Sequence, residues 1–163
     1  MAVFFAKAIS KDEASDAIVV SFGREWLKKI KEKEVSLVIR RRAPVKIEPR
    51  LMYMHFNYPY GAICARAKIE SLEKISLNTA LENAEQLSLT KEEISQYFGV
   101  LDDIYCYKVS GIVFSKKPIT TSEFNSRLKY HPPQSFIVLS IKATIVLNEM
   151  WADVAAKAEL YRD

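Results

Sequence analysis

The stretch Lys33-Glu34-Val35-Ser36-Leu37-Val38-Ile39-Arg40-Arg41-Arg42 joins a run of β-forming side chains to three consecutive arginines. Val, Leu and Ile at this density predict a strand, and Ala43-Pro44 ends it, because proline lacks the N–H that a sheet requires. A strand that ends in fixed positive charge favours an anionic partner, although a short basic run is equally typical of a solvated strand end. In a pleated strand Arg40 and Arg42 share one face and Arg41 the other, so we expect only one subset to face a given groove.

The composition indicates one compact domain. The chain has 163 residues, 49% of them hydrophobic, which is enough for one good core. Four glycines and six prolines argue against a linker-rich chain. No apolar run approaches the roughly 20 residues of a membrane span, and residues 1–8 lack the features of a secretory signal. We therefore expect a soluble, cytoplasmic protein without membrane association.

The cysteines and histidines do not indicate a metal site. Cys64 and Cys106 match no metal or redox spacing and lie in apolar runs, where a thiol packs as a small hydrophobe. His55 and His131 have no carboxylate, thiol or second imidazole at ligand spacing. The sequence also has no glycine-rich phosphate loop. We expect neither a metal nor a cofactor.

The basic residues are concentrated in the first third of the chain. The net charge is +4, and residues 1–50 hold 12 Lys and Arg against 7 Asp and Glu, whereas residues 51–115 hold 5 against 8. Such asymmetry suits a phosphate-facing patch on a neutral body, although lysine-rich helix faces produce it by chance as well.

Alternating or β-branched composition and turn residues predict five or six strands, which cover residues 17–22, 36–42, 51–56, 63–69, 104–114 and 136–141. Helical spacing and capping residues predict helices near residues 26–30, 78–86, 88–99 and 122–128. Strands and helices do not alternate regularly as in a parallel sheet. The pattern therefore predicts an α+β fold, a small mixed β-barrel with helical insertions.

The end of the chain predicts an amphipathic helix. Its apolar residues recur roughly along one stripe: Ile145, Met150, Trp151, Val154 and Leu160. The expected organisation is an N-terminal extension (1–16), a central domain (17–142) and a C-terminal helix (143–163). The helix is expected to dock on the barrel or on a second copy of the chain.

Three pieces of the sequence, taken in the order in which they occur along the chain, resemble the ASCH domains of the PUA-like superfamily. They are the basic strand end, the helix that leads to Tyr97-Phe98-Gly99, and the strand start Pro132-Pro133-Gln134-Ser135-Phe136. The resemblance covers roughly residues 17–141 and is closest to members described as presumed regulators. It implies a β-barrel whose cleft suits RNA or a modified nucleobase, with binding in most members and catalysis in some.

Binding of RNA or another nucleic acid is the first hypothesis. Arginine keeps its charge and offers a planar fork to phosphate oxygens, and tyrosine rings can stack on unpaired bases. The candidate residues are Arg40, Arg41, Arg42, Lys46, Arg50, Tyr58, Tyr60, Gln134 and Ser135.

A hydrolase that acts on a modified nucleoside or, as a ribonuclease, on RNA is the second hypothesis. It follows from the resemblance to a branch of ASCH proteins that are acetylcytidine amidohydrolases. Their motif places a lysine three residues before a threonine and a glutamate later, which Lys33, Ser36 and Glu85 can match. A desolvated Lys33 would take the proton of Ser36, whose oxygen would attack an amide of a modified nucleoside, while Glu85 would protonate the leaving amine. Alignment on Arg40 instead puts Val35 and Val38 at the first two positions and abolishes this mechanism.

A protein-interaction module is the third hypothesis. Here the C-terminal helix supplies the surface of a homodimer or of another partner, with Trp151 as its anchor.

Overall fold

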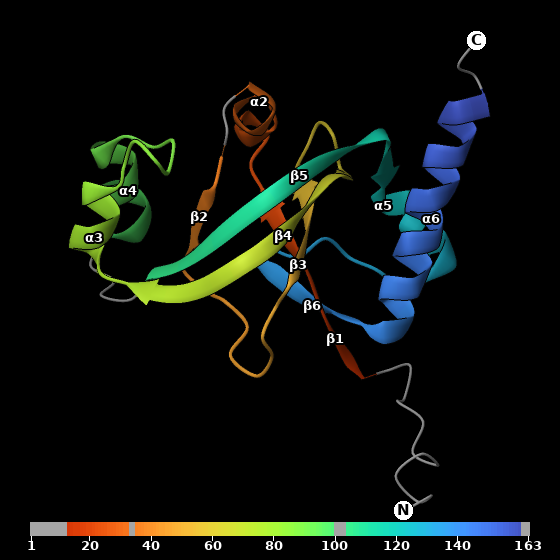
Figure 1. Ribbon diagram of the computed structural model, residues 1–163, viewed down its shortest axis with the longest axis horizontal. Helices are drawn as coiled ribbons and strands as arrows, with labels where there is room; N and C mark the ends of the chain where they lie inside the picture. The colour runs from red at the N-terminus through yellow and green to blue at the C-terminus, as the bar shows by residue number, and fades with distance from the viewer. Residues whose placement is uncertain (1–12, 33–34, 100–103, 161–163) are drawn as a thin grey trace, which may run out of the picture.

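The computed structural model describes residues 13–32, 35–99 and 104–160, with side chains as far as Trp151. Figure 1 shows one twisted sheet with helices at both of its ends and a long helix along one side. The elements are β1 (Ala14–Phe22), α2 (Glu25–Glu32), β2 (Leu37–Arg40), β3 (Leu51–Phe56), β4 (Ala62–Ile75), α3 (Leu77–Glu82), α4 (Lys91–Phe98), β5 (Ile104–Thr120), α5 (Thr121–Arg127), β6 (Phe136–Ser140) and α6 (Ile141–Leu160).

The described strands form a single mixed sheet in the order β2-β5-β4-β3-β1-β6. β1 and β3 run parallel, and the other neighbours run antiparallel. The predicted α+β class and the upper strand count are confirmed, but the sheet is not closed into a barrel, because β2 and β6 remain its edges. The seam between β2 and β1 is crossed by a side chain instead: Nη2 of Arg40 donates a hydrogen bond to the carbonyl oxygen of Ser21 at 3.2 Å.

Strands β4 and β5 extend far beyond the apolar runs that predicted them, to 14 and 17 residues. The added residues, 70–75 of β4 and 115–120 of β5, are exposed or half-buried except Ile119, and each added segment extends the ladder by pairing with residues of the other strand. Gly111, at a φ of +60°, lies where the register of the two strands shifts, and glycine adopts this backbone conformation without steric cost.

Three apolar clusters hold the elements together. One face of the sheet packs against α2 through Phe22, Leu27 and Ile30, among others. The opposite face packs against α5 and α6. The third cluster fixes α3 and α4 against the outer end of the β4–β5 ribbon, and Ile94 and Phe98 of α4 are fully buried in it. Cys64 is buried as predicted, and Cys106 is half-buried.

Helix α6 packs on the sheet of its own chain. Trp151 is buried, its ring lies 6.1 Å from that of Tyr53, and the guanidinium of Arg66 stacks on it at 4.6 Å. Trp151 is therefore not an exposed anchor, and the homodimer remains a prediction. The predicted stripe was wrong for Ile145, which is 47% exposed, and the side chains of Val154 and Leu160 lie outside the described residues.

Helix α4 has the boundaries that the sequence predicts. The Thr90 hydroxyl accepts a hydrogen bond from the Glu93 amide, and the Glu93 carboxylate accepts one from the Thr90 amide. Thr90 is therefore the N-terminal cap of this helix, and Gly99 ends the helix at a φ of +57°. Among the described residues, no helix combines the length and apolarity that a membrane crossing needs.

His55 makes stability depend on pH. It is 2% exposed, its Nδ1 has no hydrogen-bond partner among the described residues, and burial lowers its pKa from the usual 6.5. The unfolded chain therefore binds this proton more tightly than the folded chain. We expect the free energy of unfolding to fall as the pH drops from about 6.5 towards the lowered pKa of the folded state. Above about pH 6.5, we expect His55 to contribute no pH dependence to the free energy of unfolding.

Urea unfolding at several pH values between 5 and 8 measures this effect. His55→Leu should remove part of the pH dependence, whereas the matched variant His131→Gln, at an exposed position, should retain it. A His55→Leu protein with the pH profile of the parent would contradict the assignment.

Candidate nucleic-acid interface

A cleft of about 770 Å³ opens at the seam between β2 and β1. Four parts of the chain form its walls. They are the end of β1 with the start of α2, the end of β2 with the two residues after it, the region of α4, and the segment before β6. Figure 1 shows the arrangement of α2, β2 and α4. The lining residues are Ser21, Glu25, Trp26, Ile39, Arg40, Arg41, Arg42, Leu87, Leu89, Glu93, Gln96, Tyr97, Gln134 and Ser135.

All three consecutive arginines line this cleft, which corrects the prediction that only one subset could face a given groove. That prediction assumed that the strand continues to Arg42. β2 ends at Arg40, so Arg41 and Arg42 follow an irregular backbone and no longer alternate between two faces.

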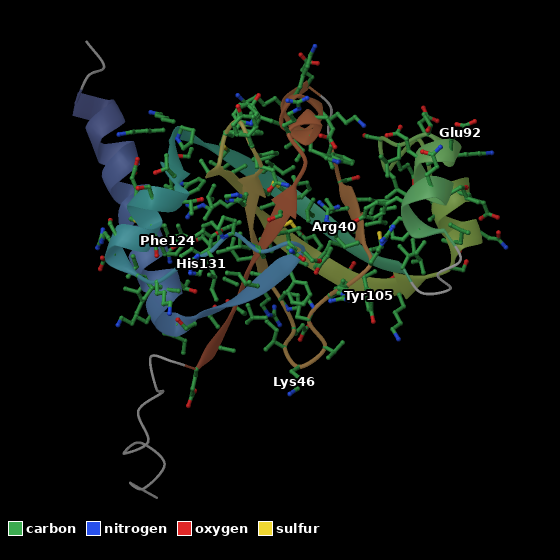
Figure 2. The ribbon with its side chains drawn as sticks, turned by 180° about the vertical axis from the view of Figure 1, so that it is seen from behind. Arg40, Lys46, Glu92, Tyr105, Phe124 and His131 are labelled. Carbon is green, nitrogen blue, oxygen red and sulfur yellow. The ribbon has the colours of Figure 1, made fainter. Side chains whose placement is uncertain are left out.

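Arg40 is half-buried at the inner end of the cleft. Figure 2 shows it between β1 and β2. Its guanidinium stacks on the ring of Phe22 at 4.4 Å, and Nη1 donates to the carbonyl oxygen of Ile39 at 2.7 Å, in addition to the Nη2 bond to Ser21. Burial lowers its pKa, yet an arginine remains protonated in proteins. These two bonds use two of the five N–H donors of Arg40.

None of the three arginines forms an ion pair with a described carboxylate. The Arg41 guanidinium stacks instead on the ring of Tyr97 at 4.6 Å, and Tyr97 is 45% exposed. The cleft therefore holds three guanidinium groups against two lining carboxylates, Glu25 and Glu93, and Glu93 lies 4.0 Å from Lys29. An anion would meet an excess of positive charge there.

The α2 side of the cleft carries the half-buried ring of Trp26. Lys29 lies 4.8 Å from this ring, donates to the carbonyl oxygen of Ser88 at 3.3 Å and is 4.0 Å from the Glu93 carboxylate. The hydrogen bond from the Thr90 amide, helped by Lys29, lowers the pKa of Glu93. Lys29 thus ties α2 to the α4 region, and the cleft has an aromatic ring on each of these two sides.

The segment before β6 completes the cleft with Gln134 and Ser135, two of the predicted residues. The Ser21 hydroxyl donates to the carbonyl oxygen of Pro133 at 2.6 Å, and the Ser21 amide donates to that of Ser135 at 3.0 Å. These bonds fix the segment on β1.

Four predicted binding residues lie elsewhere. Lys46 and Arg50 line a second cavity of about 540 Å³ together with Glu48, Glu70 and Glu73, and Figure 2 shows Lys46 in a loop away from Arg40. Tyr58 and Tyr60 are exposed in the turn between β3 and β4 and do not line the first cleft. Lys46 and Arg50 are close to the three arginines in the sequence but not in space, because the loop after Pro44 leads away from the seam between β2 and β1.

The predicted catalytic residues do not line the cleft where the structure describes them. Lys33 lies outside the described residues. Ser36 is exposed just before β2, where its carbonyl oxygen accepts a hydrogen bond from the Val109 amide at 2.8 Å, and Glu85 is exposed in the turn after α3. The hydrolase hypothesis gains no support from the arrangement of these two residues.

Sequence reasoning missed the two aromatic residues of the cleft. Trp26 contributed only to the predicted helix near residues 26–30, and Tyr97 contributed only to the Tyr97-Phe98-Gly99 motif. A local signal did exist for Tyr97. It is a large aromatic residue on the polar face of a short capped helix, with Phe98 already supplying the buried contact.

No family model and no curated protein matches this chain. Among solved structures it is similar to ASCH from Zymomonas mobilis, with a TM-score of 0.72 and 19% identity over 86% of this chain and 96% of that chain. A point mutant of the same protein gives a TM-score of 0.74 and 19% identity, over 83% and 99% of the two chains. The N-terminal domain of Staphylothermus marinus McrB is more distant, at a TM-score of 0.51 and 5% identity over 84% and 95%. This chain therefore has the fold of the ASCH domains, as the order of its sequence motifs implied.

Proposed function

We propose that this protein binds single-stranded RNA in the cleft between β2, α2 and α4. The observation that carries the proposal is that three arginines without a described carboxylate partner share one cleft with Trp26 and Tyr97. The resemblance of the sequence to ASCH domains implies a cleft that suits RNA, and the fold of this chain agrees with that resemblance.

Each part of a nucleotide has a suitable group in the cleft. Arg41 and Arg42 are exposed at the rim, where guanidinium forks contact phosphate oxygens. Aromatic faces suit an unstacked base, and the Gln134 amide can pair with the polar edge of a base. A volume of about 770 Å³ is in the range of pockets that hold a small ligand, so the cleft suits one or two nucleotides of a single strand better than a duplex.

Binding rather than turnover suits the described residues, because neither Ser36 nor Glu85 lines the cleft. A module of this kind acts by occupying its RNA site, as a regulator does.

Fluorescence anisotropy with a labelled oligouridine tests the proposal. For a single-stranded nucleic acid, each phosphate contact contributes about 0.7 to the slope of log affinity against log salt concentration. The double variant Arg41→Ala/Arg42→Ala should therefore reduce the magnitude of this slope by about 1 to 1.5. The affinity should fall about tenfold, which is 1.4 kcal/mol.

Lys46→Ala/Arg50→Ala is the matched control, because it removes the same charge from the second cavity. It should change affinity less than about twofold. Equal losses in the two double variants would indicate unspecific attraction by net charge and would contradict a binding cleft.

A further inference from the structure

A second exposed surface combines tyrosine rings with lysines. We call it the tyrosine–lysine surface and define it by Tyr58, Tyr60, Lys31, Lys116 and Lys117. Tyr58 is 83% exposed and Tyr60 46%, and the three lysines are exposed as well. Two exposed aromatic rings two residues apart offer faces on which bases can stack, and a basic surround suits a phosphate-bearing ligand.

The residues of this surface come from three segments that the fold joins. Ala62 pairs with Thr120, Ile63 with Ile119 and Ala65 with Phe114, so Lys116 and Lys117 lie opposite residues 63–65 at the start of β4. The amide and the hydroxyl of Thr121 each donate to the carbonyl oxygen of Gly61 at 3.1 Å, which holds the turn against this part of β5.

Helix α2 connects this surface to the cleft. The Asn57 amide donates to the carbonyl oxygen of Phe22 at 3.0 Å, so the turn adjoins the end of β1 from which α2 follows. Lys31 lies 5.5 Å from the Phe114 ring on β5, while Trp26, on the same helix, lines the cleft. Figure 1 shows α2 between α4 on one side and the β3–β4 turn on the other.

The charge along this route is positive. Residues 24–32 hold four basic side chains and two acidic ones. Lys31, Lys116 and Lys117 form no ion pair with a described carboxylate. Lys28 lies 4.0 Å from Glu32, and Glu25 lines the cleft, so the route has an excess of basic over acidic side chains that favours a polyanion between the arginines and the two tyrosines.

We propose that an RNA strand longer than the cleft continues across α2 and stacks bases on Tyr58 and Tyr60, while Lys31, Lys116 and Lys117 contact its phosphates. This inference rests on the proposed function, because it assumes that one RNA strand occupies both the cleft and the tyrosine–lysine surface. Stacking on aromatic side chains contributes about 1 to 3 kcal/mol per base and tolerates any sequence, so this surface extends the binding site without demanding a sequence motif.

Two oligouridines, of about 4 and about 16 nucleotides, separate this surface from the cleft. Anisotropy titrations of the full chain should show that Tyr58→Ala/Tyr60→Ala weakens binding of the long strand about tenfold and leaves the short strand unchanged. Tyr58→Phe/Tyr60→Phe is the matched control and should bind both strands like the parent, because it keeps the rings. Lys116→Ala/Lys117→Ala should flatten the salt dependence for the long strand only.

The outcomes distinguish the two proposals. If the short strand binds through Arg41 and Arg42 but the tyrosine variants bind the long strand like the parent, the extended path is wrong and the cleft proposal stands. If neither strand binds, both proposals are wrong. If Tyr58→Ala/Tyr60→Ala changes the mass of the protein in light scattering and leaves the long strand bound, the surface is a contact with protein, which also overturns the path.

Discussion

Replacing Arg40 with methionine is expected to weaken RNA binding about 100-fold, or roughly 2.7 kcal/mol, while changing the free energy of unfolding by less than about 1 kcal/mol. The large effect on binding follows from the position of the guanidinium. It lies at the inner end of the cleft, where burial weakens its contact with water and strengthens its attraction to a phosphate.

The small effect on stability follows from two opposing contributions. Methionine removes the hydrogen bonds to the carbonyl oxygens of Ser21 and Ile39 and the stacking on Phe22. It also removes a half-buried charge without a described carboxylate partner, and replacing such a charge by an apolar chain of similar length is often close to neutral.

Anisotropy and urea unfolding of the same preparations measure both quantities. Arg50→Met is the matched control, since Arg50 is exposed, lies 3.9 Å from Glu48 and lines the second cavity. It should affect neither quantity. An Arg40→Met protein that is strongly destabilised would show that the guanidinium mainly holds the seam of the sheet, and one that binds normally would remove Arg40 from the site.

Replacing Phe22 with alanine is expected to cost about 3 to 5 kcal/mol of the free energy of unfolding, the usual range for a buried phenylalanine. Phe22 is 1% exposed, its ring stacks on Phe56 at 5.6 Å and meets the edge of Trp26 at 6.2 Å. The substitution leaves a cavity below the cleft in a domain whose total stability is expected at about 5 to 15 kcal/mol.

Urea unfolding measures the loss, and Val113→Ala, at an exposed position on β5, is the control, with an expected change below about 1 kcal/mol. Phe22→Leu should remain folded with a loss of about 1.5 kcal/mol, because it retains most of the apolar volume. Since Arg40 rests on the Phe22 ring, the leucine variant should also bind RNA more weakly. Unchanged stability of Phe22→Ala would contradict the packing described here.

Much of the fold could be predicted from local patterns. The strand at 51–56 and the helix between Thr90 and Gly99 were predicted because their signals are local: alternation of side chains, a capping box and a glycine stop. The lengths of β4 and β5 could not be predicted, because residues 70–75 and 115–120 are largely polar and their strand conformation depends on pairing with the other strand. The closed barrel was wrong for a related reason, since closure depends on whether two edges pair, and Arg40 crosses the seam instead.

The sequence by itself determined the α+β class, the ASCH-like order of elements, and the presence of three arginines at a strand end followed by Gln134 and Ser135 far along the chain. Tertiary structure alone decided that these five residues share one cleft, that Lys46 and Arg50 lie in another, and that Trp26 and Tyr97 complete the site. The physical reason is that propensity and periodicity act over a few residues. A cleft is made where distant segments meet, and that meeting is set by strand pairing and by the packing of α2 and α4 against the sheet.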